Sequence, residues 1–215
     1  MRILFCIFTC SKYQQRQEAL KNSWLKGNDF IFLSDKDSDN SVCLSEIDGH
    51  KSCELRQISS IDWLVKNRPN YDWYFFSDDD TFVNTKNLFA LKLNSEICYG
   101  KVLSRNSDRQ NPCWPKYPNL TSYLSGGAGF MISSRNMENL SALNKVKFRT
   151  GYSDLTLGIF IQMKNLILEN LEGFHSDNPE NLFHSDGNIM ESITYHYVTP
   201  DNMLKIYEKL SSHPN

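Results

Sequence analysis

The sequence lacks several features that would assign a chain of 215 residues to a class directly. Its six cysteines form no Cys-x-x-Cys pair and show no zinc-site spacing, so no zinc site of that kind is predicted. No window approaches the long apolar run that a membrane-spanning helix needs. The formal net charge of −2 gives no reason to expect nucleic acid or an anionic membrane as a partner.

Two glycine motifs are also missing. The strand-helix-strand opening of the chain carries no Gly-x-Gly-x-x-Gly, so a dinucleotide is not indicated. The glycine-rich segment Ser125–Ile132 is not followed by Gly-Lys-Ser/Thr, so it is not a P-loop. Its glycines still permit the close approach of a backbone to a ligand.

The sequence also favours one cellular setting. The apolar run Arg2–Phe8 is too short for a signal-peptide core, and the cysteine pattern suggests free thiols rather than disulfides. We therefore expect a cytoplasmic protein, in the host cytoplasm if the gene is viral. The sequence leaves open whether the chain is a domain of a longer polypeptide.

Composition indicates one globular domain over residues 1–215. A hydrophobic content of 40% and a charged content of 22% are ordinary for such a domain. Strand and helix patterns alternate along the chain, which predicts an α/β fold. Expected strands are Ile3–Phe8, Phe30–Leu33, the run from Trp73, Ile97–Leu103, Leu166–Leu171 and Ile193–Val198. Expected helices are Tyr13–Leu25, Cys53–Lys66, a short one from Asn84 or Thr85, Arg135–Leu143, one that has Ser153 as its N-cap and carries Leu155 to Met163, and one opened by Pro200.

The most informative stretch is Trp73–Val83, in which four aromatic residues run into three consecutive aspartates. The aromatic run predicts a strand buried on both faces, and ligands of open α/β sheets bind at the carboxyl ends of the strands. Adjacent carboxylates repel each other, and this repulsion grows where the dielectric is low. Oxygen ligands of this kind suit Mg²⁺ or Mn²⁺, so we expect a divalent cation beside Asp78, Asp79 and Asp80. A solvated acidic turn is the alternative.

Two further segments are candidates for ligand contact. The opening unit resembles a nucleotide-binding one in which an acid at the end of the second strand, here Asp35, meets a ribose. Residues Ser104–Ser122 hold three prolines and two aromatic residues expected to be exposed, Trp114 and Tyr117. A loop of this length predicts a mobile lid, with a passive insertion as the alternative.

Several of these pieces, taken in order, resemble the Fringe-type glycosyltransferases, a family of β-1,3-transferases with a GT-A fold. The similarity covers about residues 1–182. The segments that carry it are Thr9–Lys12, Arg16, Leu20, Ser23-Trp24, Phe30–Asp35, Phe75–Val83, Gly100-Lys101, Ser125–Ser133, Ser153–Gly158 and Gly173–Ser176. The resemblance implies a mixed, mostly parallel sheet flanked by helices, with a nucleotide-sugar half at about 1–100 and an acceptor half at about 101–215. The size is most like that of a virus-encoded member, as in chlorella viruses.

The resemblance also implies a donor and a cofactor. It implies a UDP-sugar held by Mn²⁺ or Mg²⁺, with Asp78, Asp80 and His175 as metal ligands and His184 as the rival histidine. The other residues that it implies near the donor are Thr9, Ser11, Arg16, Asp35, Arg56, Ser77, Asp78, Asp79, Gly126 and Gly127. The guanidinium group of Arg16 suits a phosphate because its planar fork can donate two hydrogen bonds to one oxyanion. The alternative role for Arg16 is a surface salt bridge.

The acidic motif that the resemblance identifies at Ser153–Gly158 supplies a candidate general base. By resemblance Asp154 activates a hydroxyl of a glycan or glycoprotein acceptor, which receives a hexose or deoxyhexose. The family commonly has two adjacent acids there, whereas Ser153 precedes Asp154 in this chain. Asp177 and Asp186 are the next candidates.

Two other functions fit parts of the pattern. A phosphatase of the haloacid-dehalogenase type also uses Asp-x-Asp after a strand, although its motif follows the first strand and Phe82 stands where it has Thr or Val. A non-catalytic module that binds nucleotide sugars is the second alternative.

Overall fold

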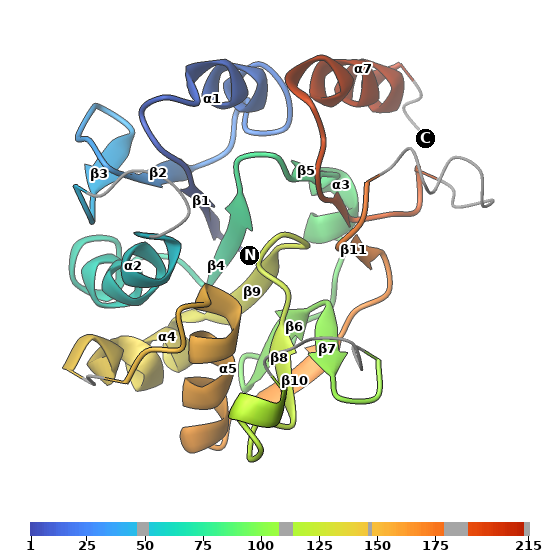
Figure 1. Cartoon of the computed structure of the whole chain (residues 1–215). Helices are drawn as coiled ribbons and strands as arrows, with labels where there is room; N and C mark the ends of the chain where they lie inside the picture. Colours follow the sequence, from blue (N-terminus) through green and yellow to red (C-terminus); the bar gives the residue numbers. More distant parts are fainter. Residues whose placement is uncertain (47–51, 108–113, 146–147, 179–188, 213–215) are drawn as a thin grey trace.

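A mixed sheet forms the centre of the computed structural model, which describes residues 1–46, 52–107, 114–145, 148–178 and 189–212 (Figure 1). In this described part the sheet has seven strands in the order β10-β6-β9-β4-β1-β2-β3. Their bounds are β1 Ile3–Phe8, β2 Phe30–Ser34, β3 Ser41–Cys43, β4 Trp73–Asp78, β6 Ile97–Gly100, β9 Phe130–Ser133 and β10 Ile167–Asn170. Only β9 runs antiparallel to its neighbours among the pairings of these strands, so the predicted mixed, mostly parallel α/β sheet is confirmed.

The central strand β4 is buried on both faces, as its aromatic run predicts. Phe75 packs into the hydrophobic core on one face, and Tyr74 and Phe76 pack into the core on the other. Helices α1 (Gln14–Lys21) and α7 (Pro200–Ser211) cover the first face, whereas α2 (Cys53–Asn67), α4 (Ser134–Leu140) and α5 (Ser153–Met163) cover the second (Figure 1). The carboxyl ends of β1 and β4 and the first turns of α2 and α5 line one pocket.

Smaller elements complete the fold. A three-stranded sheet of the described residues joins β5 (Phe82–Val83), β12 (Thr194–Tyr195) and β11 (Phe174–His175), with β12 in the middle. Strands β7 (Val102–Ser104) and β8 (Ser122–Leu124) form a hairpin. The other short helices are α3 (Thr85–Phe89), η2 (Trp114–Lys116) and η3 (Ser141–Lys145).

Some expected boundaries are wrong. Helix α1 ends at Lys21 rather than Leu25, with Asn22 as C-cap, and turns follow it up to Gly27, which has a φ of 80°. The expected strand Ile97–Leu103 divides at Lys101. Its first part stays in the large sheet, whereas the second pairs with β8, and the carbonyl of Lys101 accepts a bond from the N–H of Ser125. As predicted, Pro200 opens α7, with the Thr199 side chain as N-cap.

The loop expected as a lid is partly packed. Trp114 is buried, with only 5% of its surface exposed, and it packs with Tyr123 and Leu155. The Arg105 guanidinium lies 5.1 Å from the Trp114 ring centroid and donates to the carbonyl oxygens of Trp114 and Tyr117. The expectation of exposed aromatic residues is therefore wrong for Trp114. Residues 108–113 lie outside the described part, so the lid itself stays a prediction.

No helix in the described ranges is long and apolar enough to cross a membrane.

Candidate active site

A pocket of 710 Å³ lies at the carboxyl ends of β1 and β4. Four parts of the chain meet in it: the turn after β1, the first turn of α2, the aspartate triplet, and the segments that approach α5. Residues from these parts that line it are Thr9, Cys53, Glu54, Arg56, Gln57, Asp78, Asp79, Asp80, Ser125, Gly126, Gly127, Tyr152, Ser153 and Asp154. Arg16 of α1 and the two residues after β12, His196 and Tyr197, also line it. Candidates from both expected halves of the chain thus share one cavity.

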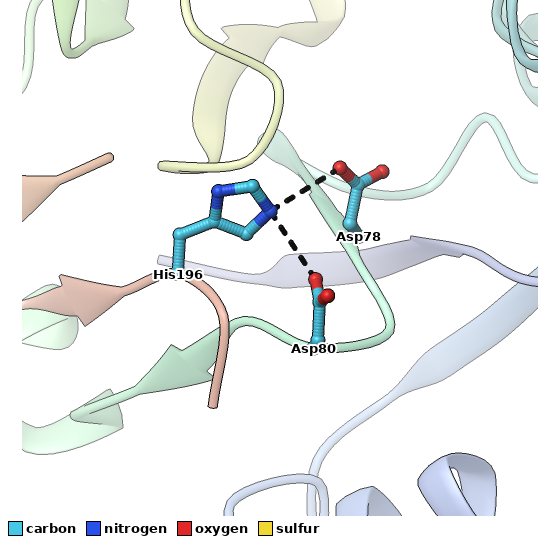
Figure 2. A group of neighbouring side chains, drawn as sticks. All are labelled: Asp78, Asp80 and His196. Carbon is cyan, nitrogen blue, oxygen red and sulfur yellow. Dashed lines mark ion pairs between the residues drawn. The ribbon is translucent and has the colours of Figure 1, made fainter. Parts of the chain in front are cut away.

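Asp78 and Asp80 face a histidine that the sequence did not single out. His196 Nε2 lies 3.2 Å from Asp80 Oδ1 and 3.8 Å from Asp78 Oδ2 (Figure 2). One potential ligand atom from each of the three residues lies within 4.8 Å of the others. Two carboxylate oxygens and one imidazole nitrogen form a donor set that suits Mn²⁺ or a similar ion.

Backbone pairing brings His196 to the triplet. Strand β12 runs antiparallel to β5, which follows the triplet directly, with Tyr195 opposite Phe82. Just beyond, the N–H of Val198 donates to the carbonyl of Asp80 at 2.8 Å. These contacts on both sides fix the backbone of His196 beside the triplet.

The charges of the group are strongly coupled. Loss of solvent raises the pKa of Asp78 to about 7, and the neighbouring charge of Asp80 adds to the rise. Burial alone would raise the pKa of Asp80, but the hydrogen bond and charge of His196 outweigh it and lower that pKa. Burial alone would lower the pKa of His196, yet Asp80 and Asp78 raise it. The ionised form of Asp78 therefore needs a positive charge nearby, which a divalent metal would supply.

His175, the expected third ligand, is not a member of this group. Its Nε2 lies 3.0 Å from Ser192 Oγ, and its ring stacks on Tyr195 with 5.0 Å between the ring centroids. The reason is its strand: β11 pairs with β12 and lies one strand farther from the triplet than His196 does. The assignment of the histidine near the carboxylates is thereby corrected to His196, and the rival His184 lies outside the described residues.

Asp79 bonds to Thr9 and Arg16 rather than to His196. The hydroxyl of Thr9 donates to Asp79 Oδ2 at 2.6 Å, and Arg16 donates to Asp79 Oδ1 at 2.7 Å. Arg16 also lies 3.2 Å from Asp80 Oδ2. Asp79 is 3% exposed, and burial raises its pKa although Thr9 and Arg16 act against that rise. Both oxygens of Asp79 are engaged, so its role in this structure is to anchor Arg16 at the pocket.

Three of the expected donor contacts do not line the pocket. Asp35 accepts from the N–H of Ser11 at 2.6 Å, from the Ser11 hydroxyl at 3.1 Å and from the Ser34 hydroxyl at 3.0 Å. Burial alone would raise the pKa of Asp35, but these hydrogen bonds lower it. Asp35 and Ser11 therefore fix the turn after β1 to the end of β2. The side chain of Ser77 is buried in β4.

The glycine-rich segment supports both the candidate base and the histidine. The N–H of Gly126 donates to Asp154 Oδ2 at 3.0 Å, and a Cβ at Gly126 would lie 2.6 Å from Asp154 Oδ1. A Cβ at Gly127 would lie 2.1 Å from the His196 ring. A side chain at either position would have to displace the Asp154 carboxylate or the His196 ring, so the two glycines let both groups lie close to one loop. Asp177 is exposed and outside the pocket lining, and Asp186 is not described.

The profile of one protein family, described as Fringe-like, matches residues 1–214. The chain belongs to the Fringe-like family. This confirms the resemblance that the ordered motifs indicated.

Individual proteins agree with membership of the Fringe-like family. Human N-acetyllactosaminide β-1,3-N-acetylglucosaminyltransferase 2 is 22% identical over 98% of this chain, and the chain spans 63% of that protein's length. A glycosyltransferase involved in glycosylation of the major capsid of PBCV-1 has a TM-score of 0.53 at 13% identity, with 97% of this chain and 100% of that chain covered. The galactosyltransferase LgtC has a TM-score of 0.55 at 13% identity, with 100% and 98% covered. These structures are GT-A glycosyltransferases, so the fold is of that type.

Proposed function

We propose that this chain transfers a sugar from a UDP-sugar to a hydroxyl group of a glycan, with Mn²⁺ or Mg²⁺ as cofactor. The observation that carries the proposal is that Asp154 and the Asp78–Asp80–His196 group line one pocket. Both features suit transfer from a sugar nucleoside diphosphate, because a cation can stabilise the charge that develops on the leaving diphosphate and a carboxylate can accept the proton of the acceptor hydroxyl. Membership of the Fringe-like family supports the same chemistry.

Asp78, Asp80 and His196 would hold the metal ion. When bound, the ion supplies Lewis-acid stabilisation to the diphosphate oxygens. Arg16, held beside Asp80 by its pair with Asp79, offers N–H groups to the same phosphates. Arg56 lines the neighbouring wall, and one of its NH groups donates to the carbonyl of Thr9 at 3.0 Å. The donor side of the pocket thus combines a cation site with two arginines.

Asp154 is the proposed general base. The acceptor oxygen forms a bond to the anomeric carbon while the bond from that carbon to the diphosphate breaks, and the acceptor proton passes to the carboxylate. The N–H of Gly126 holds Oδ2 of this carboxylate, and its place in the first turn of α5 favours negative charge. Asp154 lines the cavity, and its Oδ1 accepts from the hydroxyl of Ser153 at 3.3 Å.

The first test is binding. Thermal shifts should be measured with UDP, other nucleoside diphosphates and UDP-sugars, with and without Mn²⁺, because ligands that bind only the native state raise apparent stability. We expect the largest shift with a uridine nucleotide plus Mn²⁺, and we expect Asp80→Ala to abolish the Mn²⁺-dependent part. A full shift in Asp80→Ala would refute the metal site.

The second test is turnover. UDP release should be followed with UDP-N-acetylglucosamine and other UDP-sugars, with N-acetyllactosamine among the first acceptors because it appears in the name of the human relative. Asp154→Asn keeps the size of the side chain and removes its basicity, so transfer should fall about 10²–10⁴-fold with donor affinity unchanged. UDP binding without UDP release for any acceptor would favour a binding module. Phosphate release from simple phosphomonoesters would favour the phosphatase.

A further inference from the structure

We propose that Glu54 is a positioning residue for transfer, which holds the segment that carries Asp154; this inference rests on the proposed function. Glu54 lies in the first turn of α2 and is 9% exposed. Its Oε1 accepts from the N–H of Thr150 at 2.9 Å and from the hydroxyl of Thr156, and its Oε2 accepts from the N–H of Gly151 at 3.2 Å. A single carboxylate therefore joins two residues of the segment just before α5 to the first turn of that helix.

The segment held in this way leads directly to the candidate base. The hydroxyl of Thr150 accepts from the N–H of Tyr152 at 3.0 Å and donates to the carbonyl of Tyr152 at 2.8 Å, which closes a tight loop. Gly151, in the middle, has a φ of 85°, a conformation that favours glycine. Asp154 follows two residues after this loop, in the first turn of α5. A shift of the loop would therefore move Asp154.

The geometry links the two walls of the pocket. Cys53 and Arg56, the neighbours of Glu54 in α2, line the cavity on the donor side, and Tyr152 and Asp154 line it on the other side. Hydrogen bonds to a charged group are stronger than neutral ones, and a buried carboxylate without its donors would be costly. The three donors thus stabilise the buried Glu54 carboxylate, and the carboxylate in turn holds the segment that carries these donors. Because a displacement of 1 Å at a reacting group can cost about 10²-fold in rate, this link bears on turnover.

Steady-state kinetics of Glu54→Ala test the role. We expect kcat for transfer to fall about 10–100-fold while KM for the donor stays within about twofold. Glu54→Gln keeps one acceptor oxygen and should lie between Glu54→Ala and the wild type. Asp62→Asn, which removes a carboxylate from the same helix at an ion pair with Lys66, is the matched control and should behave as the wild type.

A double-mutant cycle distinguishes positioning from general weakening. If Glu54 acts through Asp154, Glu54→Ala should cost little further rate in an Asp154→Asn background, because residues that act as a unit are not additive. Full additivity in the cycle, or a wild-type kcat in Glu54→Ala, would overturn the inference while leaving Asp154 as the base. A wild-type rate in Asp154→Asn alone would instead overturn the proposed base, and this inference with it.

A second pair of variants covers the case in which Glu54→Ala does not fold. Thr156→Val keeps the shape of the side chain and removes its hydroxyl bond to Glu54, whereas Thr156→Ser keeps the hydroxyl. We expect Thr156→Val to lower kcat with unchanged donor KM and Thr156→Ser to retain most of the rate. Equal kcat values for the two variants would overturn the inference.

Discussion

His196 Nε2 lies 3.2 Å from Asp80 Oδ1, although the two residues come from distant parts of the chain. The contact depends on β12 pairing with β5, which sets the histidine against the turn that carries the triplet. His175 lies on the next strand and contacts Ser192 instead. The two histidines therefore form a natural pair of test and control.

We predict that His196→Ala loses Mn²⁺-dependent stabilisation by UDP, whereas His175→Ala keeps it. Loss of a ligand should weaken Mn²⁺ binding at least about tenfold, because even mutation of residues that hydrogen-bond to metal ligands lowers metal affinity by about that much. The measurement is the difference between thermal midpoints with and without Mn²⁺ at fixed UDP, for each variant. His175→Ala serves as control even if its own midpoint falls, because only the Mn²⁺-dependent difference is compared. The reverse pattern would restore His175 as the ligand.

Much of the fold could be predicted because its signals are local. The aromatic run of β4, the turn after β1 and the proline at the start of α7 each depend on neighbouring residues, and the structure has all three. Asp78 and Asp80 could be singled out in the same way, as acids at the end of a strand, whereas Asp154 was assigned by the resemblance to the Fringe-type family. The structure brings them into one pocket.

The rest depends on pairing between distant segments, which no local pattern encodes. His196 lies within the expected strand Ile193–Val198, of which only Thr194–Tyr195 is a strand in the structure, and its Tyr-His-Tyr sequence was a signal that could have been used. Its value depends on the register of β12 with β5, and the sequence does not reveal that register. The same holds for Asp35, whose carboxylate looked available for a ribose but accepts bonds from Ser11 and Ser34.

The Arg16–Asp79 pair gives a prediction about stability. Arg16→Gln leaves the buried Asp79 with a weaker partner, so the free energy of unfolding without metal should fall by about 1–2 kcal/mol, a value reduced because Arg16 is partly exposed. Urea denaturation measures it. Lys21→Gln removes an exposed pair with Glu18 from the same helix and should change stability by no more than about 0.5 kcal/mol. Equal losses in the two variants would mean that Asp79 does not depend on Arg16.

The Asp35 carboxylate gives a prediction about pH. Hydrogen bonds lower its pKa in the folded state below the unfolded value of about 3.9. Its contribution to stability is therefore complete above the unfolded pKa and is lost as the pH falls through the folded pKa. Asp35→Asn should be less stable than the wild type near neutral pH, and the difference should shrink in acid. Urea denaturation from pH 7 downwards measures this, with Asp39→Asn at an exposed position as control. A difference that does not change with pH would contradict the prediction.

The two adjacent glycines of the pocket predict separable losses of function. Alanine at Gly127 would place Cβ 2.1 Å from the His196 ring, and alanine at Gly126 would place it 2.6 Å from Asp154 Oδ1. In both cases the obstructed atoms belong to a side chain that can move, and neither glycine has a positive φ, so the fold should tolerate the change. Gly127→Ala should therefore weaken Mn²⁺ binding, whereas Gly126→Ala should lower transfer.

Measuring both Mn²⁺ binding and transfer in each glycine variant tests whether His196 and Asp154 have separate roles. In Gly126→Ala, Mn²⁺-dependent stabilisation by UDP should match the wild type while kcat for transfer falls at least about tenfold, because the base is displaced from its productive position. In Gly127→Ala, the Mn²⁺ concentration needed for half-maximal transfer should rise, and saturating Mn²⁺ should restore part of the rate. Circular dichroism and the metal-free thermal midpoint should stay near wild type for both variants. If both variants lose metal binding and transfer together, the loop acts as one structural unit, and separate assignment of His196 to the metal and Asp154 to the proton would lose its support.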